Sequence, residues 1–91
     1  MNNEQTNNTM TNQLTTKENE VLNAICDAAI EYTGGDFTYA DEITTDLNPQ
    51  QLGGYITQLV QKGIIYVCDE EKQISGAFGY NLHEIKENIK A

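Results

Sequence analysis

Apolar residues recur at intervals of three and four along residues 15–34, which is the period of a helix that buries one face. Thr15 and Glu18 have the spacing of a capping box at the start of this series. Gly34 and Gly35 end it. We therefore expect a first helix, with Ile30 pointing away from the apolar face, towards the last helix or a second subunit. The apolar face consists of Val21, Leu22, Ile25, Ala28, Ala29 and Tyr32.

A second helical pattern, over residues 49–62, has both ends written into the sequence. Asn48 is a good N-cap, Pro49 suits the first helical position, and Gln51 can complete a capping box. Gly63 supplies a residue that stops a helix in the left-handed conformation. One face of this helix is apolar and comprises Leu52, Tyr55, Ile56, Leu59 and Val60. The opposite face comprises Gln50, Gly54, Thr57, Gln58 and Gln61.

The segment between these helices predicts a short strand and a short helix. Residues 37–38 are expected to form a small strand that pairs with a later hairpin. Thr38 can also cap a helix over residues 39–46, whose three acids lie largely on the exposed side. The apolar line of this helix comprises Ala40, Ile43 and Leu47.

A β-hairpin is expected after the second long helix. Residues 64–68 are an apolar, β-branched run that predicts a strand, and residues 69–73 form a polar tip. The second strand is expected over residues 74–81. Within it, Gly76 and Gly79 indicate a wide tip, a bulge or a point of close packing.

The two ends of the chain differ in character. Residues 1–13 are rich in Asn, Gln and Thr and show no apolar period, so we expect a disordered tail. Residues 82–90 carry Leu82, Ile85 and Ile89 at helical spacing, which predicts an amphipathic helix packed against the first one. We therefore expect one domain over residues 14–91.

This order of elements resembles the winged helix-turn-helix superfamily, in particular MarR-like regulators. Residues 14–82 carry the likeness. Its most specific part is Leu59, Lys62 and Gly63 followed by two apolar residues, which looks like the end of a recognition helix leading into a wing. The chain is also similar to small winged-helix proteins of phages and mobile elements. The resemblance implies an α+β fold in the order α-β-α-α-β-β-α, with a two-stranded wing hairpin.

In relatives that bind DNA, the third helix enters the major groove and the wing touches the backbone or the minor groove. Carried over, this makes residues 49–62 the recognition helix of a DNA-binding transcriptional regulator, with double-stranded DNA as its partner. Glutamine can pair bidentately with adenine, and Gly54 would let the backbone approach closely. The implied contact residues are Gln50, Gln51, Gly54, Thr57, Gln58, Gln61 and Lys62. The implied wing tip is Asp69, Glu70, Glu71 and Lys72.

The charge balance favours an alternative. Fourteen acids oppose five lysines, arginine is absent, and the net charge is −9. Nucleic-acid binding draws much of its affinity from cations that meet phosphates. The wing tip holds three acids and one lysine, and Lys62 is the single cation of the predicted recognition helix. The alternative is therefore an acidic protein-interaction module, or an inhibitor whose carboxylates take the place of phosphates, built on the same frame without DNA binding.

Other chemistry is not indicated, so we expect a non-enzymatic protein without a cofactor or metal. His83 is the only histidine, and the chain shows no catalytic set, metal-ligand spacing or phosphate-binding loop. Cys26 and Cys68 are compatible with a disulfide, but we expect two reduced thiols of a cytoplasmic protein. No apolar run is long enough for a membrane span. The first and last helices are candidates for the seam of a homodimer.

Overall fold

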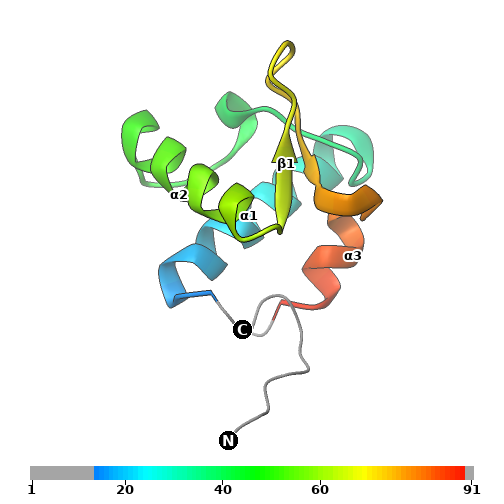
Figure 1. Ribbon diagram of the computed structural model, residues 1–91, viewed down its shortest axis with the longest axis horizontal. Helices are drawn as coiled ribbons and strands as arrows, with labels where there is room; N and C mark the ends of the chain where they lie inside the picture. The colour runs from blue at the N-terminus through cyan, green and yellow to red at the C-terminus, as the bar shows by residue number, and fades with distance from the viewer. Residues whose placement is uncertain (1–13, 90–91) are drawn as a thin grey trace, which may run out of the picture.

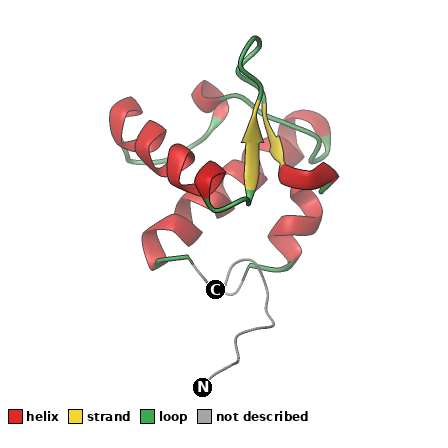
Figure 2. Cartoon of the chain, in the orientation of Figure 1, coloured by secondary structure: helices red, strands yellow, loops and turns green. Residues whose placement is uncertain are grey.

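Helix α1 (Thr16–Thr33) is the element against which the other helices pack (Figure 1). The computed structural model describes residues 14–89, which form an α+β domain of three α-helices and one antiparallel hairpin (Figure 2). The predicted capping box is confirmed, because Thr15 accepts from the amide of Glu18 and the Glu18 carboxylate accepts from the amide of Thr15. Gly34, in the left-handed conformation with φ 76°, ends the helix as expected.

The apolar face of α1 is buried as predicted, except at its last member. Tyr32 is 52% exposed. Its ring packs edge-on against Phe37 and Tyr39, with ring centres 6.0 Å apart in both pairs. Tyr32 therefore contributes to an aromatic cluster at the rim of the domain and not to the core. The core residues of α1 are Val21, Leu22, Ile25, Cys26, Ala28 and Ala29.

Helix α2 (Pro49–Gln61) begins where the sequence predicts and ends one residue earlier than predicted, with Lys62 as its C-cap. The amide of Gln51 donates to Asn48 Oδ1 at 2.8 Å, and the amide of Asn48 donates to Gln51 Oε1 at 3.2 Å. Leu52 and Leu59 are buried. The prediction that Val60 belongs to the buried face is wrong, because Val60 is 37% exposed. It lies at the edge of the apolar stripe and lines a groove next to the hairpin.

The expected helix over residues 39–46 is wrong in extent. Only η3 (Ala40–Glu42), a single 3-10 turn, forms there. Ile43 has an extended backbone and buries its side chain from that conformation. The two threonines that follow disfavour a helix because their branched side chains crowd the preceding turn. Thr45 also accepts the amide of Leu47 with its hydroxyl at 3.3 Å, which competes with a helical bond.

The capping role predicted for Thr38 is also wrong. The residue before η3 is Tyr39, and its side chain makes no capping hydrogen bond. Thr38 instead forms the expected strand contact as an isolated antiparallel bridge to Ile74, with backbone hydrogen bonds of 2.9 and 2.8 Å. Thr38 is fully buried, so the bridge ties the segment after α1 to the hairpin.

The hairpin consists of β1 (Ile65–Val67) and β2 (Ile74–Gly76), paired so that Tyr66 faces Ser75. Side chains alternate across a strand, so Ile65 is buried while Tyr66 is 56% exposed. Figure 1 shows the hairpin between α2 and α3, with its tip pointing away from the helices.

The expected second strand over residues 74–81 is wrong beyond Gly76. The chain turns there into η4 (Ala77–Gly79), a 3-10 turn. Close packing, one of the three alternatives predicted for the glycines, is confirmed at Gly76. A Cβ at this position would meet the backbone of Tyr80 and lie 3.0 Å from Ile85 Cδ1. The strand ends at Gly76 because the chain turns there and brings the backbone of Tyr80 against this glycine.

Helix α3 (Leu82–Glu87) packs against α1, as predicted. Leu82 and Ile85 are buried, whereas Ile89 lies beyond the helix end and packs against the core from there. The apolar faces of α1 and α3 are therefore buried by contacts within this chain. Residues 1–13 and 90–91 lie outside the described residues, as do the predictions made for them. Within the described part, no helix combines the length and hydropathy that a membrane span requires.

Candidate functional site

The outer face of α2 presents the uncharged residues that the sequence nominated. Gln50, Gln58 and Gln61 are exposed together on this face. Gly54 is also exposed, and nothing lies within 4 Å of the position its Cβ would occupy. The helical period brings these residues together as expected, and the face is open to a partner.

Two other nominated residues use their polar atoms within the helix itself. Gln51 Oε1 accepts the amide of Asn48 as part of the cap. The hydroxyl of Thr57 donates to the carbonyl of Gly53 at 3.0 Å. An amide that pairs with adenine needs both its oxygen and its nitrogen. Gln51 can therefore read a base only by giving up its cap.

Lys62, the cation at the end of α2, is bound to α1. Its Nζ lies 2.7 Å from Oε1 of Glu18, and the side chains are 33% and 4% exposed. The same carboxylate oxygen accepts the amide of Thr15 at 2.9 Å. One buried carboxylate thus joins the first turn of α1 to the last turn of α2.

The electrostatics of this pair follow from its contacts. The hydrogen bond from Lys62, followed by that from the Thr15 amide, lowers the pKa of Glu18 although burial acts in the opposite direction. Glu18 is therefore charged near neutral pH and holds Lys62 as its counter-ion. The pair was not visible in the sequence because 44 positions separate the two residues.

Two further lysines are also paired with carboxylates. Lys17 Nζ lies 3.2 Å from Glu20, which raises the pKa of this lysine through their hydrogen bond. Lys86 Nζ lies 2.8 Å from Asp27. Lysines engaged in this way offer little net charge to a phosphate. Three of the four lysines in the described residues therefore have a carboxylate as their neighbour.

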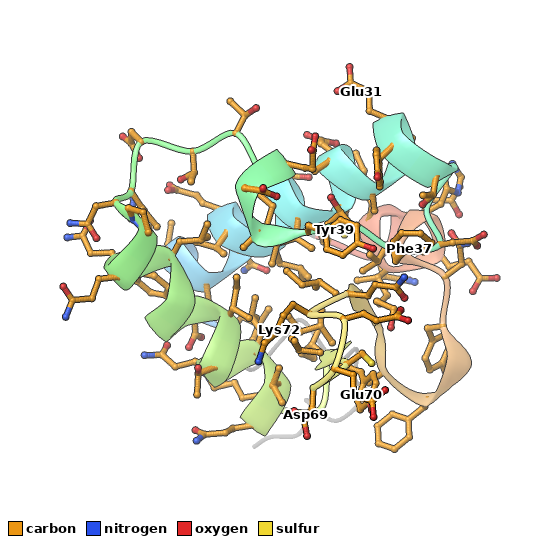
Figure 3. All side chains as sticks on the ribbon, turned by 90° about the horizontal axis from the view of Figure 1, so that it is seen from above. Glu31, Phe37, Tyr39, Asp69, Glu70 and Lys72 are labelled. Atoms are coloured by element: carbon orange, nitrogen blue, oxygen red, sulfur yellow. The ribbon has the colours of Figure 1, made fainter. Side chains whose placement is uncertain are left out.

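The hairpin tip is acidic, and its cation is Lys72. Seen from above, Asp69, Glu70 and Lys72 spread around the tip (Figure 3). Lys72 adopts the left-handed conformation with φ 62°, and its amide donates to the carbonyl of Cys68 at 2.7 Å. Within residues 14–89, it is the lysine without an ion pair to a carboxylate. With Glu71 included, the tip carries three acids and one lysine.

Three exposed apolar side chains form a surface that the sequence analysis missed. Val60, Tyr66 and Phe78 are 37%, 56% and 88% exposed and come from α2, β1 and η4. They line one open groove of about 540 Å³ together with Gly63 and Ala77. Val60 was assigned to the apolar face of a helix, and Tyr66 and Phe78 to the two strands of the hairpin. The paired glycines around Phe78 were the only local signal that the strand would end before it.

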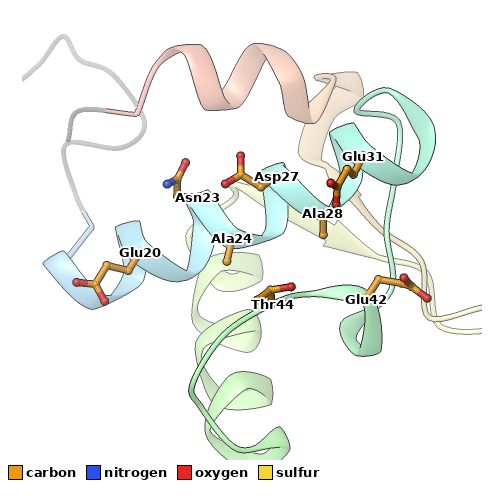
Figure 4. A pocket seen from close by; sticks show the side chains of 8 residues that line it. All are labelled: Glu20, Asn23, Ala24, Asp27, Ala28, Glu31, Glu42 and Thr44. Atoms are coloured by element: carbon orange, nitrogen blue, oxygen red, sulfur yellow. The ribbon is translucent and has the colours of Figure 1, made fainter.

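A second hollow, of about 290 Å³, lies between α1 and the segment that follows η3 (Figure 4). Glu20, Asp27, Glu31 and Glu42 contribute carboxylates to its lining. Within residues 14–89, no three His, Cys, Asp or Glu side chains gather as a metal ion would require. The hollow therefore gives the domain an acidic surface beside α1.

The two cysteines are separate thiols. Cys26 is fully buried on α1, whereas Cys68 at the end of β1 is half-buried. Burial raises the pKa of the Cys26 thiol to about 12. A thiol protonated to that extent is a poor nucleophile, so Cys26 acts as a core residue.

Comparisons with protein-family models, with curated proteins and with solved structures returned no match. Functional inference for this chain therefore depends on the geometry of its own residues.

Proposed function

We propose that this chain is a non-enzymatic winged-helix protein whose frame serves to bind another protein and not DNA. The observation that carries the proposal is the pairing of Lys62 with the buried Glu18, at 2.7 Å. In this pair, the only cation of the candidate recognition helix binds a carboxylate of the same chain. What α2 then presents outward is a row of uncharged side chains.

Electrostatics make this face a poor match for a duplex. A protein gains affinity for DNA by placing Lys or Arg against phosphates and releasing their counter-ions. The hairpin tip, which corresponds to the wing in a winged helix, holds Asp69, Glu70 and Glu71 against Lys72. A duplex that docked on α2 would bring its backbone towards these carboxylates. Repulsion would then oppose the contact that a wing normally provides.

A DNA-binding regulator of the MarR-like kind is the second candidate, because one observation favours it. Gln50, Gln58 and Gln61 are exposed on a single face of α2, and an exposed glutamine can pair with adenine in the major groove. This candidate needs affinity from base contacts without support from phosphate contacts.

Fluorescence anisotropy with a labelled random-sequence duplex separates the two candidates, at about 50 mM and about 200 mM salt. The proposal predicts no saturable binding by the wild-type chain at either salt concentration. A Gln58→Arg/Gln61→Arg variant is the matched control, since it restores cations to the same face. Salt-sensitive binding by this variant alone supports the proposal. Saturable binding by the wild type that fades with salt contradicts it and favours the regulator.

A further inference from the structure

The groove between the end of α2 and the hairpin has the composition of a docking site. None of the nine residues that line it is charged, in a chain of net charge −9. Its exposed apolar side chains, Val60, Tyr66 and Phe78, come from three different elements. A docking site would account for three exposed apolar side chains that line one groove.

Phe78 lines the groove and has an unfavourable backbone conformation. Its φ and ψ are 58° and 28°, in the left-handed region, and its side chain is 88% exposed. A residue with a Cβ pays roughly 1–2 kcal/mol in that region, and an exposed ring gains little from burial in return. The neighbouring Gly79 adopts a similar conformation without that penalty. An aromatic side chain at this position therefore serves something other than the stability of the chain.

Charge decides what covers the groove. Tyr66 is three residues from Asp69, about 10 Å at the rise of a strand, which a ligand of a few residues spans. A ligand that covers Tyr66 and extends along the hairpin therefore reaches the acidic tip. A second copy of the chain would bring another net charge of −9 and be repelled. Residues 1–13 offer only Met1 and Met10 as apolar side chains, too little to fill the groove.

We propose that the groove of Val60, Tyr66 and Phe78 docks a basic protein segment, with an apolar side chain seated against Phe78 and flanking Lys or Arg side chains near the hairpin tip. This inference rests on the proposed function and names its surface and the chemistry of its partner. Aromatic anchors supply contact area at an interface, while charges at its rim steer the approach and select the partner.

The test is a titration of the isotope-labelled full chain with three synthetic peptides, followed by two-dimensional NMR. The first peptide is an amphipathic helix with Leu on one face and Lys on the other. The second replaces Lys by Glu, and the third replaces Leu by Ser. The first peptide is expected to bind saturably, with the largest shift changes at Val60, Tyr66 and Phe78. The second and third are expected to bind at least tenfold more weakly.

Variants separate specific docking from general attraction to an acidic protein. Phe78→Gly is expected to weaken the first peptide at least tenfold, and Glu70→Lys/Glu71→Lys by a similar factor. Glu31→Lys, an exposed acid of α1 outside the lining of the groove, is the matched control and is expected to change nothing. Circular dichroism of each variant verifies that the fold is retained.

Each other outcome overturns the inference in a distinguishable way. Binding that maps to another surface and ignores Phe78→Gly refutes the groove while the proposed function stands. Absence of peptide binding together with salt-sensitive duplex binding refutes both. Equal binding of the Glu peptide, or no binding of any peptide, refutes the basic partner. Sedimentation that shows a dimer lost on Phe78→Gly assigns the groove to a second copy instead.

Discussion

Lys62 Nζ lies 2.7 Å from Oε1 of Glu18, a carboxylate that is almost fully buried at the first turn of α1. The contact joins the end of one helix to the start of another and pairs the lysine that caps α2. It follows that α2 presents an uncharged outer face, while the lysine that follows it is paired with a carboxylate of α1.

Acid should weaken the fold through Glu18. Because its contacts lower the pKa of Glu18 in the folded state, its contribution to stability is full above the unfolded value near 4.5 and is lost as the pH falls through the folded value. We expect the difference in free energy of unfolding between wild type and Glu18→Gln to be largest at about pH 7 and to shrink between about pH 5 and pH 3. Urea denaturation at each pH measures it.

The comparison with Glu18→Gln isolates one carboxylate, since the other acids titrate equally in both proteins. A difference that stays constant from neutral to acidic pH would show that Glu18 is not held by an ionic contact.

Phe78→Gly should leave the stability unchanged or raise it by up to about 1.5 kcal/mol. The glycine removes a left-handed strain of roughly 1–2 kcal/mol and loses about 0.5–1 kcal/mol to its greater freedom in the unfolded chain. Phe78→Ala is the control, because it removes the ring and keeps the strain. Thermal and urea unfolding of both variants measure the effect. A loss of more than about 1 kcal/mol in Phe78→Gly would mean that the ring supports the fold.

The glycines Gly76 and Gly54 should respond in opposite ways to alanine. Gly76→Ala places a methyl group against the backbone of Tyr80 and is expected to cost about 2–3 kcal/mol. Gly54→Ala meets open space on an exposed helix and is expected to stabilise by about 0.5–1 kcal/mol. Urea denaturation of the two variants gives the comparison. Equal effects would contradict the close packing at Gly76.

One thiol should react in the native protein. Cys26 is fully buried, and its pKa is raised to about 12, whereas Cys68 is half-buried at the end of β1. Ellman's reagent near pH 8 is expected to modify Cys68 at once and Cys26 only after denaturant is added. Rapid modification of both thiols in the native state would show that α1 opens readily.

Local signals in the sequence predicted the helices and their caps well. Asn48 with Gln51, and Thr15 with Glu18, act within one turn, so their spacing is sufficient to predict their contacts. The short helix over residues 39–46 failed because its apolar spacing is equally compatible with an extended chain that buries Ile43. The long second strand failed because the fold-back at Gly76 depends on Tyr80 and Ile85, which pack on it only in the folded chain.

The candidate site was predictable only in part. The outward residues Gln50, Gln58 and Gln61 follow from helical periodicity alone. The partner of Lys62 does not, since it lies on another helix and no short-range pattern links the two. The exposure of Phe78 depends on a backbone turn that its apolar character argues against. The features that favour protein binding are therefore those that arise from tertiary structure.

A double-mutant cycle on Glu18 and Lys62 tests most directly whether the lysine at the end of α2 stabilises the fold. The free energies of unfolding of wild type, Glu18→Gln, Lys62→Met and the double variant are measured by urea denaturation at neutral pH. We expect a coupling of about 1–2 kcal/mol, because Glu18 is buried while Lys62 remains one-third exposed to water. A coupling near zero would show that Lys62 does not stabilise the fold. Lys62 would then count as a cation that α2 can place against DNA phosphates.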